Sequence, residues 1–377
     1  MISIITVSFN AVESIEKTIK SVISQKQSDY EYIIIDGGST DGTVETIRKY
    51  SKYISYWCSE PDNGIYDAMN KGIQKAKGNI VNFLNANDVF FDDYVLCKVE
   101  TYFNDNVGMD VLIGKELIEG KVCDFFLSRT PKSLYIDSFF PHQSTFSKKS
   151  VYSSFRGFDT KFRICADYDW ILGVYSNGYN IQYVDDIFAV YDTSGTSSSV
   201  KGIVEQYQIS KKYLLLNSLD DLETYLRDFY LDMYKKVYFR NLIRKSKPDN
   251  DIIASVKKCI KASQINIWGV GNIGKALCDF LINCGFVVNH FFVSECMSCH
   301  AEYNHIPITE YMKDKVYVVV ASELYDYDIC KRLNAIGLSE HIDFISYKSL
   351  YDMIISDYIQ NGGNDYGFNE VLTRSNL

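Results

Sequence analysis

Polar residues gather at two places where a short apolar run ends. The run 32–35 is followed by Asp36-Gly37-Gly38-Ser39-Thr40-Asp41-Gly42, and the run 80–84 is followed by Asn85-Ala86-Asn87-Asp88. A carboxylate can hold ligand hydroxyls or take a proton from one, and carboxylate and amide oxygens bind hard cations such as Mg²⁺ or Mn²⁺. Asp-Gly and Gly-Gly pairs also form tight turns without any ligand. The first cluster therefore indicates either a ligand-binding carboxylate or a tight turn, and the second indicates a cation site.

Alternating strands and helices would position these clusters. The predicted strands are the apolar runs 2–9, 32–35, 53–59 and 80–84. Segments with helical spacing lie between them, over 15–23, 43–52 and 66–77. This alternation predicts an α/β fold with a parallel, doubly wound sheet. Both clusters then lie at the carboxyl ends of strands, where open α/β sheets bind ligands.

Seven short motifs follow one another along the first half of the chain. They are Thr6-Val7-Ser8-Phe9-Asn10, Asp36–Thr43, Glu60–Gly72, Leu84–Asp88, Pro141–Phe146, Gly157–Asp159 and Ala166–Asp169. Together and in this order they resemble the family 2 glycosyltransferases, which have the GT-A fold, over roughly residues 2–195. The resemblance implies transfer of a sugar from a nucleoside-diphosphate sugar to an acceptor hydroxyl, with inversion at the anomeric carbon.

The resemblance also assigns roles by position. The expected nucleotide-binding residues are Val7, Phe9, Asn10 and Asp36, with Asp62 to Asn70 closing over the nucleotide. Asp167 corresponds to the catalytic base that deprotonates the acceptor. Read without the resemblance, Asp167 and Asp169 are acids of the kind that cap helices, and His142 is a core or loop histidine.

The predicted cation site departs from the family pattern. The family has two acidic positions separated by one residue, and here Asn85 and Asn87 occupy them. Three interpretations remain open: Asn87 and Asp88 share a Mn²⁺ or Mg²⁺ ion, His142 contributes a ligand, or the protein binds metal poorly and is slow. We favour the first, with weaker binding than usual because an amide carries no charge.

The composition excludes some classes of protein. The net charge of −9 argues against a nucleic-acid binder. The ten cysteines are scattered, and Met1 begins a strand-like run without a leader pattern, so we expect reduced thiols and a cytoplasmic protein, or one at the inner face of the cytoplasmic membrane. No apolar run reaches the roughly 18 residues of a spanning helix.

The middle of the chain reads as helical. Residues 222–247 combine an apolar, aromatic face with basic residues, which is typical of a helix lying on an anionic membrane. The alternative, which we prefer, is that the apolar face packs on its own domains.

A second βαβ pattern contains Gly269, Gly271 and Gly274 in G-x-G-x-x-G spacing between a strand and a helix, with Glu295 where a ribose-binding acid would lie. It predicts a Rossmann-like accessory domain, with nucleotide binding there as the minor alternative. Cys296-Met297-Ser298-Cys299-His300 resembles a haem attachment motif, but we interpret it as a loop.

The predicted domains are 1–200 (GT-A), 201–262 (helical linker), 263–350 (Rossmann-like) and 351–377 (C-terminal tail). The leading hypothesis is a hexosyltransferase that uses a nucleoside-diphosphate sugar, with UDP favoured, and a lipid-linked glycan acceptor. Residues 59–72 resemble the branch of the family found in O-antigen or capsule polysaccharide assembly. The alternatives are an inactive nucleotide-sugar-binding scaffold and, ranked last, a dinucleotide-dependent oxidoreductase.

Overall fold

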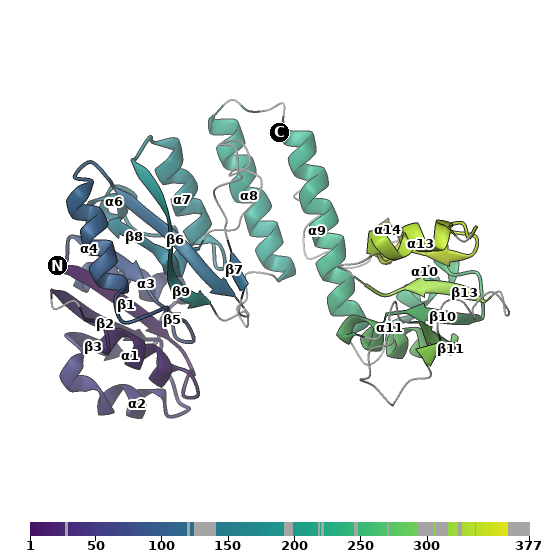
Figure 1. Ribbon diagram of the computed structural model, residues 1–377, viewed down its shortest axis with the longest axis horizontal. Helices are drawn as coiled ribbons and strands as arrows, with labels where there is room; N and C mark the ends of the chain where they lie inside the picture. The colour runs from purple at the N-terminus through teal and green to yellow at the C-terminus, as the bar shows by residue number, and fades with distance from the viewer. Residues whose placement is uncertain are drawn as a thin grey trace. The chain divides into compact units, whose positions relative to one another are not determined.

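The computed structural model describes residues 1–26, 29–118, 121–123, 141–191, 199–217, 219, 222–244, 248–269, 271–292, 305–306, 316–322, 326–335 and 337–360. The chain forms two compact units, Met1–Leu226 and Arg227–Leu377 (Figure 1). The division between them falls inside the segment 201–262 that was predicted to be a linker. Helices do occupy most of that segment.

The first unit contains one large sheet. Its described strands are β1 (Ile2–Ser8), β2 (Tyr30–Asp36), β3 (Tyr56–Ser59), β4 (Ile80–Phe83), β5 (Val89–Phe90), β6 (Val111–Ile118), β7 (Lys121–Cys123), β8 (Thr145–Lys148) and β9 (Ile181–Tyr191). They pair in the order β3-β2-β1-β4-β8-β6-β9-β5, with β7 on β6. The helices are α1 (Ile15–Ile23), α2 (Thr43–Lys49), η1 (Ser51–Tyr53), α3 (Ile65–Lys75), α4 (Val95–Asp105), η2 (His142–Ser144), α6 (Lys149–Ser154), α7 (Ala166–Ser176) and α8 (Val200–Leu216).

The prediction of a parallel sheet is correct for the four strands from which it was made, and the later strands add both antiparallel pairs and the parallel pair β6–β9. Strands β1 to β4 pair in parallel, but β8 is antiparallel to both β4 and β6. The regular alternation of strand and helix ends after β4, and antiparallel pairs need no crossover helix. The α/β class therefore holds, with a mixed sheet.

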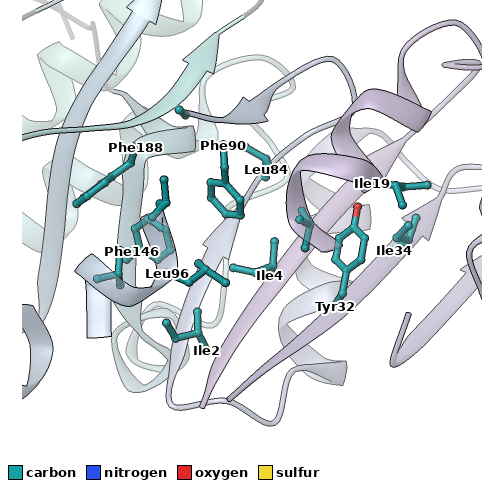
Figure 2. Packing of buried hydrophobic residues seen from close by; sticks show 14 of the residues in the cluster. Ile2, Ile4, Ile19, Tyr32, Ile34, Leu84, Phe90, Leu96, Phe146 and Phe188 are labelled. Atoms are coloured by element: carbon teal, nitrogen blue, oxygen red, sulfur yellow. The ribbon is translucent and has the colours of Figure 1, made fainter. Parts of the chain in front are cut away.

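Strand alternation divides the core between the two faces of the sheet. On one face, Ile2 and Ile4 of β1 join a fully buried cluster with Ile19, Tyr32 and Phe146 (Figure 2). On the other face, Ile5 meets α3, where a Cβ built on Gly72 would lie 2.5 Å from its Cγ2. The glycine lets α3 approach the sheet closely, so the start of α3 is fixed by packing.

The second unit contains a smaller sheet. Its described strands are β10 (Gln264–Trp268), β11 (Val287–Phe292), β12 (His305–Ile306), β13 (Tyr317–Val320) and β14 (Phe344–Ile345), and its helices are α10 (Asn250–Cys259), α11 (Asn272–Asn283), α13 (Asp326–Ala335) and α14 (Tyr347–Gln360). The strands pair in parallel in the order β12-β11-β10-β13-β14. This order, which reverses at β10, is that of doubly wound sheets.

Residues 351–360, which the predicted boundaries assign to the tail, are helical. Helix α14 extends to Gln360 and buries Leu350, Ile354 and Ile355. Residues 361–377 lie outside the described part of the chain.

Helix α9 (Glu223–Ile243) tests the membrane-surface interpretation of 222–247. Its apolar residues Tyr230, Tyr234 and Phe239 are fully buried. The Phe239 ring lies 6.1 Å from Phe280 and 5.6 Å from Tyr347. Burial of this face within the chain favours the packing interpretation.

We expect Phe146→Ala to lower the free energy of unfolding of the first unit by about 3–5 kcal/mol. The Phe146 ring is fully buried and packs 5.6 Å from Phe188, at the junction of β4, β8 and β6. Urea unfolding followed by far-UV circular dichroism measures the change. Phe91→Ala is the matched control, because Phe91 is 42% exposed and its loss should cost less than about 0.5 kcal/mol. Equal losses in the two variants would contradict this account of the core.

Candidate functional site

Three strand ends meet at the Asp36 carboxylate. The parallel register places Ser8 of β1 and Ser59 of β3 on either side of Asp36 at the end of β2. Both hydroxyls donate to Asp36, Ser8 at 2.9 Å and Ser59 at 2.6 Å. The carboxylate also accepts from the Ser39 hydroxyl at 2.6 Å and from the N–H groups of Gly38 and Ser39.

These hydrogen bonds decide the charge of Asp36. Burial raises its pKa, but the bonds from Ser39, Ser59 and Ser8 outweigh burial and hold the pKa below its usual value. The carboxylate is thus ionised, and both of its oxygens are engaged by the chain. The structure places Asp36 as the residue that builds the strand-end turn, and a ligand hydroxyl would have to replace one of these serines.

The turn after β2 is tied to the end of β1. The Asn10 side chain accepts from the Thr40 N–H at 3.1 Å, and the Asn10 N–H donates to Ser39 Oγ at 2.8 Å. Asn10 has a positive φ of 47°, a conformation that Asn tolerates better than most residues. Asp41 accepts from the Val12 N–H. These hydrogen bonds therefore fix the backbone of the loop after β1 against the turn after β2.

Phe9, Gly37 and Asp62 converge beside this turn. A Cβ built on Gly37 would lie 2.6 Å from Asp62 Oδ2 and 3.4 Å from the Phe9 ring. The Phe9 side chain is 66% exposed, which is unusual for an aromatic residue at a strand end. Val7, in contrast, is buried in the sheet. The structure thus brings Phe9, Asn10, Asp36 and Asp62 together and leaves Phe9 as the exposed apolar surface.

Helix α3 links this region to the segment before α7. The Asn70 amide clamps Phe158, accepting from its N–H at 2.8 Å and donating to its carbonyl at 2.9 Å. The Arg163 guanidinium donates to the Asn63 carbonyl. Asn70 is therefore committed to the protein, in a position where we expected a nucleotide contact.

Asp167 lies in the first turn of α7. Its Oδ1 accepts from the Tyr66 hydroxyl at 2.7 Å and from the Tyr168 N–H at 3.0 Å. Glu205 of α8 supports the residues just before it, accepting from the N–H groups of Arg163, Ile164 and Cys165 at 2.8–3.0 Å. Glu205 lies after the last of the seven motifs of the first half, Ala166–Asp169, so no motif predicts this contact.

The loop 85–88 does not assemble the predicted cation site. Asp88 is 4% exposed, and its Oδ2 accepts from Gln143 Nε2 at 3.0 Å. Asn87 has a φ of 98° and is half-buried, and Asn85 Oδ1 is buried without a hydrogen-bond partner. His142 is buried and stacks on Phe83, and burial lowers its pKa.

A divalent cation prefers charged oxygen ligands, and the one carboxylate of this loop is bound within the protein. Within the described ranges, no three His, Cys, Asp or Glu residues are placed to hold a metal ion. The residues present therefore fit a tightly bound cation poorly. The reaction steps proposed below do not use a metal ion.

Glu116 of β6 is a buried acid that sequence reasoning missed. It is 1% exposed, and burial together with the charge of Asp88 raises its pKa to about 8. Hydrogen bonds from the Ser144 and Gln143 backbones act in the opposite direction. Nothing in the alternation of Val111–Ile118 distinguishes this position, because only the folded sheet brings it to Asp88.

The glycines of the second unit have distinct surroundings. Gly269 has a φ of 125°, and a Cβ there would lie 2.7 Å from the Ala321 carbonyl oxygen. A Cβ on Gly274 would overlap the Gly269 carbonyl, whereas Gly271 has no atom within 4 Å of an added Cβ. This is the geometry of a tight strand-to-helix turn. Nucleotide binding there stays a prediction, and Glu295 and Cys296–His300 lie outside the described residues.

The sequence of the first unit is similar to known glycosyltransferases. Residues 3–145 match the model of the glycosyl transferase family 2. An uncharacterized glycosyltransferase of Mycobacterium tuberculosis, Rv1514c, is 37% identical over 180 residues, which cover 45% of this chain and 67% of that protein. The PGL/p-HBAD biosynthesis glycosyltransferase Rv2957 of the same organism is 24% identical over 203 residues, 53% of this chain and 79% of that protein.

Among solved structures, residues 1–349 of S. aureus TarS in complex with UDP-GlcNAc align with a TM-score of 0.50 and 15% identity, covering 68% of this chain and 80% of that one. The longer TarS chain is covered over 48% of its length. The first unit is thus a glycosyltransferase domain of the GT-A type. The chain belongs to glycosyl transferase family 2.

Restoring the missing acid should strengthen metal binding. We expect Asn87→Asp to tighten UDP binding in the presence of Mn²⁺ about tenfold relative to the wild type, or about 1.4 kcal/mol, because a carboxylate replaces an amide ligand. Titration calorimetry with and without Mn²⁺ measures this. Asn79→Asp adds the same charge at an exposed turn and should leave UDP affinity unchanged. An Asn87→Asp variant indifferent to Mn²⁺ would show that residue 87 does not face the cation.

Glu116→Gln should stabilise the protein more at pH 8 than at pH 5. Glu116 keeps its proton in the folded state up to a pKa of about 8, whereas the unfolded chain releases it above about 4.5. The folded state therefore binds more protons in this window, and wild-type stability falls as the pH rises through it. Glutamine has no proton to release. Urea unfolding at both pH values tests this, with the exposed Glu45→Gln as control; an equal effect at both would contradict a neutral Glu116.

Proposed function

We propose that this protein is an inverting hexosyltransferase that moves a sugar from a nucleoside-diphosphate sugar, with UDP favoured, to a hydroxyl of a lipid-linked surface-polysaccharide acceptor. One observation carries the proposal: a single segment touches both halves of the site. Asp62 lies against Gly37, next to which the Phe9 ring also lies, and Tyr66, in the first turn of α3, donates to Asp167. The residues suited to hold a donor and the residue suited to activate an acceptor are thus joined.

The donor half offers an exposed aromatic face and fixed backbone groups. The Phe9 ring provides a surface for a nucleobase, because a flat apolar face excludes water from a stacked ring. The turn at Asp36 lies at the carboxyl ends of the parallel strands, where ligands of such sheets bind. In this proposal, Asp62 accepts hydrogen bonds from ribose or sugar hydroxyls.

The acceptor half supplies the base. Asp167 takes the proton of the acceptor hydroxyl as its oxygen attacks the anomeric carbon from the face opposite the leaving group. The new C–O bond forms as the bond to the diphosphate breaks, its electron pair leaves with the nucleoside diphosphate, and the configuration inverts. The proton stays on Asp167 until solvent removes it.

The substrate classes rest on the relatives. The TarS structures contain UDP and UDP-GlcNAc, and Rv2957 is named for PGL/p-HBAD biosynthesis. A soluble nucleotide-sugar donor and a surface-glycan acceptor carried on a lipid agree with an enzyme working at the inner face of the cytoplasmic membrane. None of the helices in the described ranges has the length and apolarity that crossing a membrane requires.

One alternative has an observation in its favour. Asn87 replaces an acid, and Asp88 is bound to Gln143, so a weakly active or inactive protein that only binds nucleotide sugars is the second candidate. Hydrolysis of the donor separates the two, because a scaffold would bind UDP-GlcNAc without releasing UDP.

We expect Asp167→Asn to lower the turnover of donor hydrolysis or transfer about 100-fold or more, while UDP affinity stays within about twofold. The amide keeps the shape of the side chain but cannot accept the proton. UDP release from a panel of UDP-GlcNAc, UDP-glucose and GDP-mannose measures turnover, and calorimetry measures affinity. Asp185→Asn, at a side chain 80% exposed, should behave as wild type. Near-normal turnover of Asp167→Asn would refute the assignment of the base.

A further inference from the structure

Tyr66 is a buried residue whose hydroxyl reaches the side chain assigned as the base. It is 6% exposed, and its hydroxyl lies 2.7 Å from Asp167 Oδ1 and 2.7 Å from the Ile164 carbonyl oxygen. The hydroxyl has one proton, and an ionised carboxylate is the stronger acceptor. The ring is itself fixed, packing 5.4 Å from Phe158. Tyr66 thus presents a rigid donor to Asp167.

The described hydrogen bonds to the Asp167 carboxylate all reach one of its two oxygens. Oδ1 accepts from both Tyr66 and the Tyr168 N–H. No described residue donates to Oδ2. An aspartate side chain rotates freely about two bonds unless hydrogen bonds fix it, and two donors on one oxygen set the plane of the carboxylate. The second oxygen is then held in one direction, and none of the described residues donates a hydrogen bond to it.

We propose that Tyr66 is a positioning residue that orients Asp167 for proton abstraction and stabilises its ionised form. This inference rests on the proposed function. Tyr66 also connects the two halves of the site. It belongs to α3, and residues 60–64, just before this helix, lie against the turn after Asp36 and against Arg163. Closure of this segment over a donor would therefore set the geometry of the base.

Four ionisable groups around Asp167, namely Tyr66, His142, Tyr152 and Cys165, stay uncharged near neutral pH and add no charge beside it. Burial lowers the pKa of His142, which keeps the imidazole neutral. Burial and the charge of Asp167 raise the pKa of Tyr152 and of Cys165, so both stay protonated. Burial and the same charge hold the pKa of Tyr66 well above its usual value, so Tyr66 remains a donor throughout the range of an assay.

The test is Tyr66→Phe, which removes the hydroxyl and keeps the ring against Phe158. With the donor of the panel that the wild type hydrolyses fastest, we expect kcat to fall about 10- to 100-fold, because small misplacements of a catalytic group have effects of this size. KM for that donor should stay within about twofold. The acidic limb of the kcat–pH profile should move to higher pH, because the carboxyl loses a hydrogen bond that favours its charged form.

Tyr50→Phe is the matched control. Tyr50 also donates to a carboxylate, Glu16, at 2.6 Å, but between α1 and the end of α2, and its loss should leave kcat and the pH profile unchanged. Unchanged kcat in Tyr66→Phe overturns the inference. A second outcome also overturns it. If kcat falls only as much as the folded fraction in a thermal melt and the pH profile does not move, the hydroxyl serves only the stability of the fold.

The failure of this inference can be told apart from the failure of the proposed function. If Asp167→Asn abolishes turnover and Tyr66→Phe does not reduce it, the inference alone falls. If Asp167→Asn retains turnover, Asp167 is not the base, and the proposed mechanism and the role of Tyr66 fall together. A UDP titration of each variant confirms that the donor half is intact.

Discussion

The buried carboxylate of Asp36 is the constraint on which the first unit's ligand-binding edge depends. An isolated buried charge is costly, and it is retained only where hydrogen bonds replace the lost water. Here serines from two neighbouring strands and the turn after β2 supply them. Three parallel strand ends are thereby fixed to one group. The turn that follows can then hold Asn10 and admit Asp62 beside Gly37 without further support.

Helix α3 connects this edge of the sheet to the segment around the start of α7. The glycine at position 72 allows the helix to lie close to β1. Asp62, just before the helix, lies beside the strand-end turn, and Tyr66 and Asn70 in the helix contact the segment before and at the start of α7. Glu205 fixes the other side of that segment. A site built in this manner depends on backbone contacts more than on any single ligand-facing side chain.

The sequence predicted the fold class because apolar runs and helical spacing are local signals, and it offered Asp167 and the strand-end turn as candidates because their motifs are contiguous. It did not predict the antiparallel β8, since pairing direction depends on how the chain returns. It assigned Asn70 to a nucleotide, although the folded chain uses that amide on Phe158. Glu116 and Glu205 carried no signal, because each acts on residues that are distant in the sequence. Roles that depend on such long-range contacts require the structure.

Asp167 and Asp169 show why position alone does not define a base. Both lie in the first turn of α7, where the helix N-terminus favours negative charge. Asp169 is 8% exposed and forms an ion pair with Lys212 at 2.7 Å, so its charge is already neutralised. Asp167 has no described cation beside it, is only half-buried, and is held through one oxygen by neutral donors. Neutral donors orient a carboxylate without supplying the opposite charge that would weaken it as a base. Of these two acids, Asp167 is the one that neutral donors orient and that has no cation beside it within the described residues.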